Sequence, residues 1–181
     1  MLAVIIIVIV VIALGIVFWA IGTSNKFKRM VIKIDEADSG IDVALTKRYD
    51  TLTKLQNVVK GYAKHEMDVL SSVTQMRTGM GIAEKQQINR QLDEAMRNMN
   101  IVVENYPELR SNENYLQLQD SIREVEDHLQ AARRLYNMNI STYNQSIAVF
   151  PASIIANNQH LKPREFFEVD EKKREDVVID L

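Results

Sequence analysis

The amino-acid sequence predicts an all-α protein in which an N-terminal transmembrane helix precedes an elongated antiparallel bundle of three to four helices. The first observation is an uncharged apolar run from Leu2 to Ile21. The second is that apolar residues recur at heptad spacing over the long stretches that follow, a pattern typical of packed helices. The third is that no stretch of comparable length alternates apolar and polar residues, as a half-buried strand would.

Composition sets the class of protein. Hydrophobic residues make up 46% of the 181 residues, which is enough for a core, and the formal net charge of −2 gives no electrostatic reason to expect a nucleic-acid partner. The chain has no cysteine, so disulfides and thiolate metal sites are excluded. We divide the chain into an anchor at 1–23, a helical bundle at 24–168 and a charged tail at 169–181, which we predict to be disordered.

The apolar run has the length of a membrane span. About 20 helical residues rise about 30 Å, the thickness of the hydrocarbon core of a bilayer, and a helix satisfies its own backbone hydrogen bonds in lipid. Trp19 lies near the polar end of the run, where interfacial aromatic residues are common. A cleavable signal peptide is the alternative, but the run exceeds the usual apolar core of about 7–15 residues and no Lys or Arg precedes it. We therefore predict an uncleaved anchor.

Basic residues follow the span and none precedes it; they are Lys26, Lys28, Arg29 and Lys33. Because positive charge is enriched on the cytoplasmic side of membrane helices, we expect a single-pass protein of the cell (inner) membrane with its soluble domain in the cytoplasm. The lipid bilayer is thus the first predicted partner.

Two rows of apolar residues, each with a period of seven, predict one long helix after the span. One row is interrupted by Arg48, and the other by Asp38 and Glu66. A break at 22–25 precedes this helix, and the glycine-containing segment 78–81 ends it. The rows consist of Phe27, Ile34, Ile41, Leu55, Tyr62 and Val69, and of Val31, Leu45, Leu52, Val59 and Val73.

Two further helices follow. One carries apolar residues at alternating steps of four and three from Ile88 onward and is stopped by Pro107. The other begins after Asn112, carries a row with a period of seven and is ended by Pro151. The short connections between the three helices favour antiparallel neighbours.

The predicted helix lengths do not match. A first helix of about 50 residues is about 75 Å long and the second is about 36 Å long, so the start of the first helix lacks a partner within the bundle. Either the helix breaks near Gly40 and folds back as a fourth helix, or it stays straight and buries its apolar seam against a second copy or another membrane protein. The seam residues are Phe27, Val31, Ile34, Ile41 and Leu45.

Charged residues interrupt or border the apolar rows, and the best-attested use of such buried charges is to fix register or partner choice. The candidates are Arg48, Glu66, Glu126 and Arg133. Counting along the predicted helices places Glu66 next to Arg133, and Arg48 too far away to join them. The alternative is that these side chains snorkel to water at the edge of the seam.

We predict no catalytic, cofactor-binding or metal site. Di-iron helical bundles need a Glu three residues before a His on two helices, and neither His65, His128 nor His160 has one. Glu124 and His128, four residues apart, supply only one helix's share of a metal site. No nucleophile constellation or phosphate-binding glycine loop is present, so we predict a protein that is not an enzyme.

Several motifs resemble the signature of the bacterial LemA family. They are KRYD at 47–50, VKGYAKHE at 59–66, YPEL at 106–109, YN at 136–137 and again at 143–144, FP at 150–151, IIA at 154–156 and FFE at 166–168. The resemblance covers nearly the whole chain in order, and it implies a membrane-tethered helical bundle with no established biochemical activity. Thr53 stands where the family usually has proline, which favours a straighter first helix.

These features together lead us to expect a non-enzymatic scaffold or adaptor that self-associates or binds another membrane or envelope protein through its helix seams. One alternative is a ligand-sensing helical module, which requires a pocket of convergent polar groups. The other is a metal-binding bundle enzyme, which requires a bound metal ion.

Overall fold

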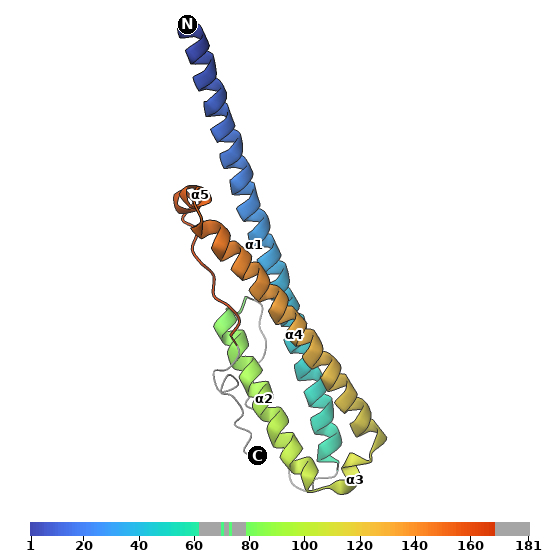
Figure 1. The fold of residues 1–181 in the computed structure, drawn as a ribbon. Coiled ribbons are helices and arrows are strands. Elements are labelled where there is room, and N and C mark those ends of the chain that lie inside the picture. The colour runs from blue at the N-terminus through green and yellow to red at the C-terminus, as the bar shows by residue number, and fades with distance from the viewer. Residues whose placement is uncertain (62–69, 71–72, 74–78, 169–181) are drawn as a thin grey trace, which may run out of the picture. The chain divides into compact units, whose positions relative to one another are not determined.

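A computed structural model describes residues 1–61, 70, 73 and 79–168 (Figure 1). These residues form helices α1 (Leu2–Lys60), α2 (Ile82–Glu104), α3 (Pro107–Arg110), α4 (Glu113–Ala148) and α5 (Ala152–Asn158), with no strand among them. The predicted all-α fold, an apolar N-terminal helix followed by a helical bundle, is confirmed. The predicted disordered tail at 169–181 lies outside the described residues.

The chain forms two compact units, which we describe separately. The first unit consists of Met1–Ala37 and Leu135–Glu165, and the second of Asp38–Arg134 and Phe166–Leu181.

Helix α1 is longer at its start and shorter at its end than the sequence predicts. It continues without interruption through the predicted break at 22–25 and through Gly40, where one glycine costs only about 1 kcal/mol in a helix. It also continues through Thr53, as the missing proline favours. The prediction that it extends to residue 78 is wrong, because it ends at Lys60 and both Leu70 and Val73 are non-helical. Gly61 follows directly, and a Cβ at this position would lie 3.3 Å from the Val58 carbonyl oxygen, a tight contact that glycine avoids.

The burial of the seam residues overturns the expectation of an uncovered seam. Phe27 and Ile34 are buried in the first unit, and Ile41 and Leu45 in the second, while Val31 is half-buried. In the first unit α4 supplies the cover, and its Asn139 side chain donates a hydrogen bond to the Lys33 carbonyl at 3.0 Å. Helix α2, about 35 Å long, is still shorter than the part of α1 that follows the apolar run, so the cover at the start of the seam comes from α4, which has 36 residues and is about 54 Å long.

In the second unit α1 and α2 run parallel, whereas we predicted antiparallel neighbours. Lys85 contacts Asp38, and Asp93, further along α2, contacts Arg48, further along α1. The predicted short turn is in fact a connection of about 20 residues, with a reach of up to about 70 Å, and α2 is only about 35 Å long. The chain can therefore return to the start of this part of α1 before α2 begins.

Pro107 and Pro151 each follow a helix end as predicted, since α2 ends at Glu104 and α4 at Ala148. Each proline also lies at the start of a short helix that we did not predict. Pro107 is the first residue of α3, where its missing amide proton is no loss, and Pro151 caps α5. The buried Leu109 and Ala156 attach α3 and α5 to their units.

Candidate functional site

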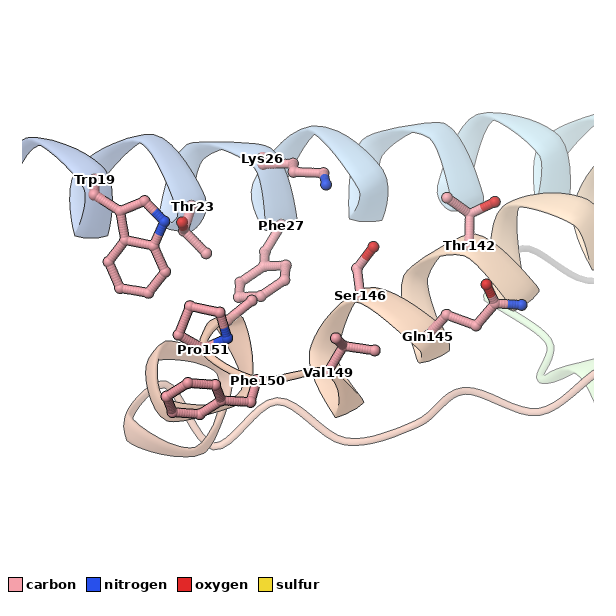
Figure 2. A pocket seen from close by; sticks show the side chains of 11 residues that line it. Trp19, Thr23, Lys26, Phe27, Thr142, Gln145, Ser146, Val149, Phe150 and Pro151 are labelled. Carbon is pink, nitrogen blue, oxygen red and sulfur yellow. The ribbon is translucent and has the colours of Figure 1, made fainter.

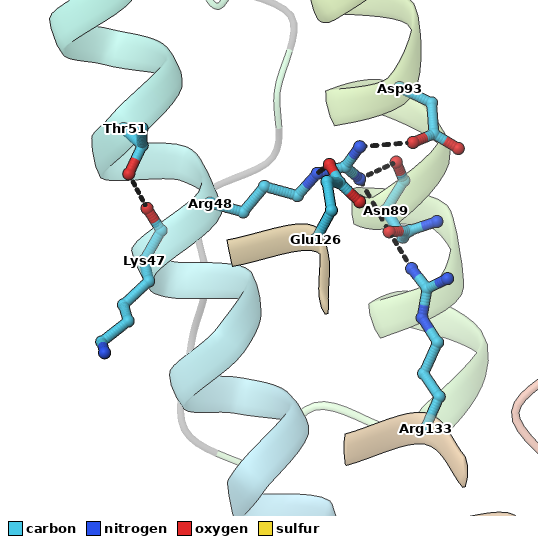
Figure 3. Close-up of polar contacts among 7 residues, drawn as sticks. All are labelled: Lys47, Arg48, Thr51, Asn89, Asp93, Glu126 and Arg133. Carbon is cyan, nitrogen blue, oxygen red and sulfur yellow. Dashed lines mark hydrogen bonds and ion pairs between the residues drawn. The ribbon is translucent and has the colours of Figure 1, made fainter. Parts of the chain in front are cut away.

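Arg48 is the centre of a buried ion network in the second unit (Figure 3). It lies on α1 and is only 4% exposed. Its Nη2 lies 2.5 Å from Asp93 Oδ1 on α2, and its Nε lies 2.6 Å from Glu126 Oε1 on α4. Its Nη1 donates to Asn89 Oδ1 on α2 at 2.8 Å. One guanidinium therefore joins three helices through charged or polar partners.

Arg133, also on α4, extends the network on the side of α2. Its Nη2 donates to the same Asn89 Oδ1 that accepts from Arg48 (Figure 3), and its guanidinium lies 4.8 Å from the centre of the Phe167 ring. Burial lowers the pKa of Arg133, the nearby positive charge of Arg48 lowers this pKa further, and the carboxylates of Asp93 and Glu126 raise it. Two arginines and two carboxylates thus balance each other within one cluster.

Lys85 forms a second buried ion pair in the same unit. It lies in the first turn of α2, is 1% exposed, and places its Nζ 2.8 Å from Asp38 and 2.7 Å from Asp42. The two aspartates are one turn apart on α1 and so face the same side of the helix. We did not predict this site, although Asp38 interrupts an apolar row and Lys85 is three residues before Ile88 in the apolar stripe of its helix.

The structure brings together three of the four predicted register residues: Arg48, Glu126 and Arg133. The expectation that Arg48 is too distant was wrong, because it rested on a first helix that is too long. Near-complete burial of Arg48 also excludes the alternative that it snorkels to water. Glu66 lies outside the described residues, so its pairing with Arg133 stays a prediction. Asn89 and Asp93 were missed, because nothing in their own spacing marks them.

The carboxylates of Asp93 and Glu126 are paired with the guanidinium of Arg48, so the arrangement is suited to fixing the register of three helices. Over the described residues, no group of three or more His, Asp or Glu is placed to hold a metal ion. His128 lies 3.6 Å from Glu124, and both side chains are largely exposed. His65 lies outside the described residues.

The first unit contains a pocket of about 430 Å³ (Figure 2). Its walls combine polar side chains from α1 and from the last two turns of α4 with apolar side chains from α1 and from the turn between α4 and α5. The lining residues are Trp19, Thr23, Lys26, Phe27, Thr142, Gln145, Ser146, Val149, Phe150, Pro151 and Ala152. Trp19 is thus at once a wall of this pocket and a residue of the apolar run.

Fold and site define a class of protein: an all-α bundle with buried ion pairs, whose first helix contains a stretch long and apolar enough to cross a membrane. The chain belongs to the LemA family, because the model of that family matches residues 37–181. A curated relative, Protein LemA of Metamycoplasma hominis, is 28% identical over 173 residues, which cover 92% of this chain and 79% of the relative. The resemblance seen in the motifs is therefore confirmed.

Proposed function

We propose that the protein is a non-enzymatic, membrane-tethered scaffold or adaptor, and that its helical bundle binds another membrane or envelope protein or a second copy of itself. The observation that carries this proposal is the course of α1. The helix that contains the apolar span continues without a break to Lys60 and contributes Arg48 to the ion network. A bundle that binds a partner on this helix would hold that partner at the membrane.

The partner-binding surface cannot be the seam from Phe27 to Leu45, because the chain itself covers most of it. The second unit nevertheless exposes large apolar side chains on three helices: Val43 on α1, Ile101 on α2 and Leu116 on α4. Isolated exposed apolar residues are common on any protein, so these three positions are the places at which to test for a partner.

Crosslinking in intact membranes tests the proposal. A photo-reactive amino acid at Val43, Ile101 or Leu116 of the full-length chain is expected to give, at one position at least, an adduct of constant mass. Mass spectrometry identifies the adduct as a dimer or a heterologous complex. Excess untagged wild-type chain is the control, since it competes for a specific partner and weakens the adduct. Monomer alone at all three positions would refute the adaptor function.

We also propose that the bundle lies on the cytoplasmic side of the inner membrane. Four basic residues soon after the apolar run, Lys26, Lys28, Arg29 and Lys33, support this orientation. Because the chain has no cysteine, Ile101→Cys gives a single reporter at an exposed site. A membrane-impermeant maleimide is expected to label it only after the inner membrane is permeabilised, and equal labelling of intact cells would reverse the orientation.

A ligand-sensing module is the second candidate function, and the pocket in the first unit favours it. Thr23, Lys26 and Gln145 line it together with apolar rings, and small-molecule sites combine a few polar groups with apolar walls in this way. A thermal-shift screen of the solubilised full-length chain tests this candidate. A stabilising compound whose effect is lost in Gln145→Leu would support it, and a screen without stabilising compounds would count against it.

A further inference from the structure

The stretch from the last part of α4 through α5 has an unusual composition. Residues 135–161 contain no Asp, Glu, Lys or Arg, although charged residues make up 25% of the chain. Within this stretch, residues 149–154, which we call the α4–α5 turn, expose three large apolar side chains: Val149 at 61%, Phe150 at 76% and Ile154 at 56%. Exposed apolar side chains that are adjacent to one another on a surface without charged residues are typical of protein or membrane interaction sites.

The position of this turn in the first unit indicates what it binds. Phe150 and Pro151 line the same pocket as Trp19 and Phe27, so the turn lies beside α1 at the level where the apolar run ends (Figure 2). The hydrocarbon core of a bilayer is about 30 Å thick and its headgroup layers add about 5–8 Å on each side. A span that fills the core from Leu2 to Ile21 therefore places Trp19, and the turn beside it, at the boundary between hydrocarbon and headgroups.

We infer that the α4–α5 turn inserts its exposed apolar side chains into the interfacial layer of the same bilayer that α1 spans. The inference rests on the membrane tethering proposed above. Continuity with the span decides for lipid over a protein partner, because a surface beside the span at this depth meets lipid without any further association step. Lys26 in the pocket wall and Lys28, two residues further along α1, can face lipid phosphates, while the turn contributes no carboxylate that would repel them.

This second contact has a mechanical consequence within the first unit. A single helix can tilt and rotate in a bilayer, and its tilt is set by packing and by interfacial anchors. A turn held in the headgroup layer beside the helix adds an anchor on one side of α1. This anchor thereby fixes the direction in which α1 tilts and its rotation about its own axis.

Fluorescence depth measurements test the inference. The cysteine-free full-length chain is reconstituted in vesicles of zwitterionic and anionic phospholipid, with an environment-sensitive probe at Phe150→Cys or Ile154→Cys. Both residues are largely exposed, so neither substitution removes a core side chain. Ile12→Cys reports on the span, and Met138→Cys is the matched control, since Met138 is 57% exposed and lies about 18 Å before Phe150 on α4.

Lipids with a nitroxide near the headgroup are expected to quench the probes at positions 150 and 154 several-fold more than the probe at 138, with a blue-shifted emission at 150 and 154. Quenching at 150 and 154 equal to that at 138, while position 12 is quenched by deep nitroxides, would overturn this inference and leave the membrane tether intact. A blue shift at 150 that lipid-borne nitroxides do not quench would also overturn it, because protein then covers the turn. Absence of quenching at position 12 would overturn both the tether and the inference.

Discussion

The ion network predicts that Arg48→Met strongly destabilises the protein. The substitution preserves most of the aliphatic volume of Arg48 but leaves Asp93 and Glu126 without their shared cation, and Asn89 without one of its two donors. The loss therefore comes from charges and hydrogen bonds, and much less from packing.

The magnitude depends on how well the orphaned carboxylates reach water. Breaking a fully buried pair costs about 3–5 kcal/mol. The Asp93 side chain is 19% exposed and that of Glu126 is 41% exposed. Because Glu126 can be rehydrated, its share is reduced, and we expect the free energy of unfolding to fall by about 2–4 kcal/mol.

Urea unfolding of the full-length chain in detergent, followed by far-UV circular dichroism, measures this loss. Arg123→Met is the matched control, because Arg123 pairs with Asp120 on the surface, where both side chains are more than two-thirds exposed and the change is expected to be within about 0.5 kcal/mol. Arg48→Met combined with Glu126→Gln is expected to recover part of the stability, since it removes one orphaned charge. If Arg48→Met is no more destabilising than Arg123→Met, the network does not hold the helices together and the reasoning fails.

Three further predictions concern the same unit and the class of function. Lys85→Met is expected to cost about 1–3 kcal/mol in the same unfolding assay, less than Arg48→Met, because Asp38 and Asp42 retain access to water; a cost equal to that of the surface control would contradict the ion pair. Arg133→Met is expected to destabilise less than half as much as Arg48→Met, since burial and the charge of Arg48 already disfavour its cation, as its lowered pKa indicates; a larger cost would show that its bond to Asn89 and its contact with Phe167 dominate. Elemental analysis of protein purified without added metal is expected to give background values, and a stoichiometric metal ion would contradict the non-enzymatic proposal.

Much of the fold could be predicted from the sequence because its signals are local. The prolines at 107 and 151 mark helix ends directly, and the uncharged run from Leu2 marks the span. The end of α1 could not be predicted in the same way. Val73 continues an apolar row of the helix and is buried, as is Leu70, yet neither residue is helical. Apolar spacing predicts that a residue is buried, but it does not show that the residue is in a helix. Leu70 and Val73 are buried outside any helix.

The residues of the candidate site could likewise be predicted from local signals, but their pairing could not. Residue type identified Arg48, Glu126 and Arg133, because charged residues beside an apolar row need partners when buried. Their pairing depends on axial position, and axial position depends on the length and direction of every preceding helix. One misplaced helix end therefore assigned Arg48 to the wrong level and left Asn89 without a role.

The long connection between the parallel helices α1 and α2 gives the buried ion pairs of the second unit a structural role, which is to fix the register of these helices. A short turn between two helices fixes how far one can slide along the other, but a connection of about 20 residues does not. Apolar rows with a period of seven match again after a slip of seven residues, so they do not forbid sliding either.

A slip of seven residues would move Lys85 about 10 Å from Asp38 and Asp42 and would separate Arg48 from Asp93 as well. Two ion sites at different levels thus specify a register that neither the connection nor the apolar rows can specify. Because these ion pairs set the register, we expect that the loss of either cation also permits α2 to slide along α1. A disulfide scan between α1 and α2 would detect this sliding as crosslinks one heptad out of register.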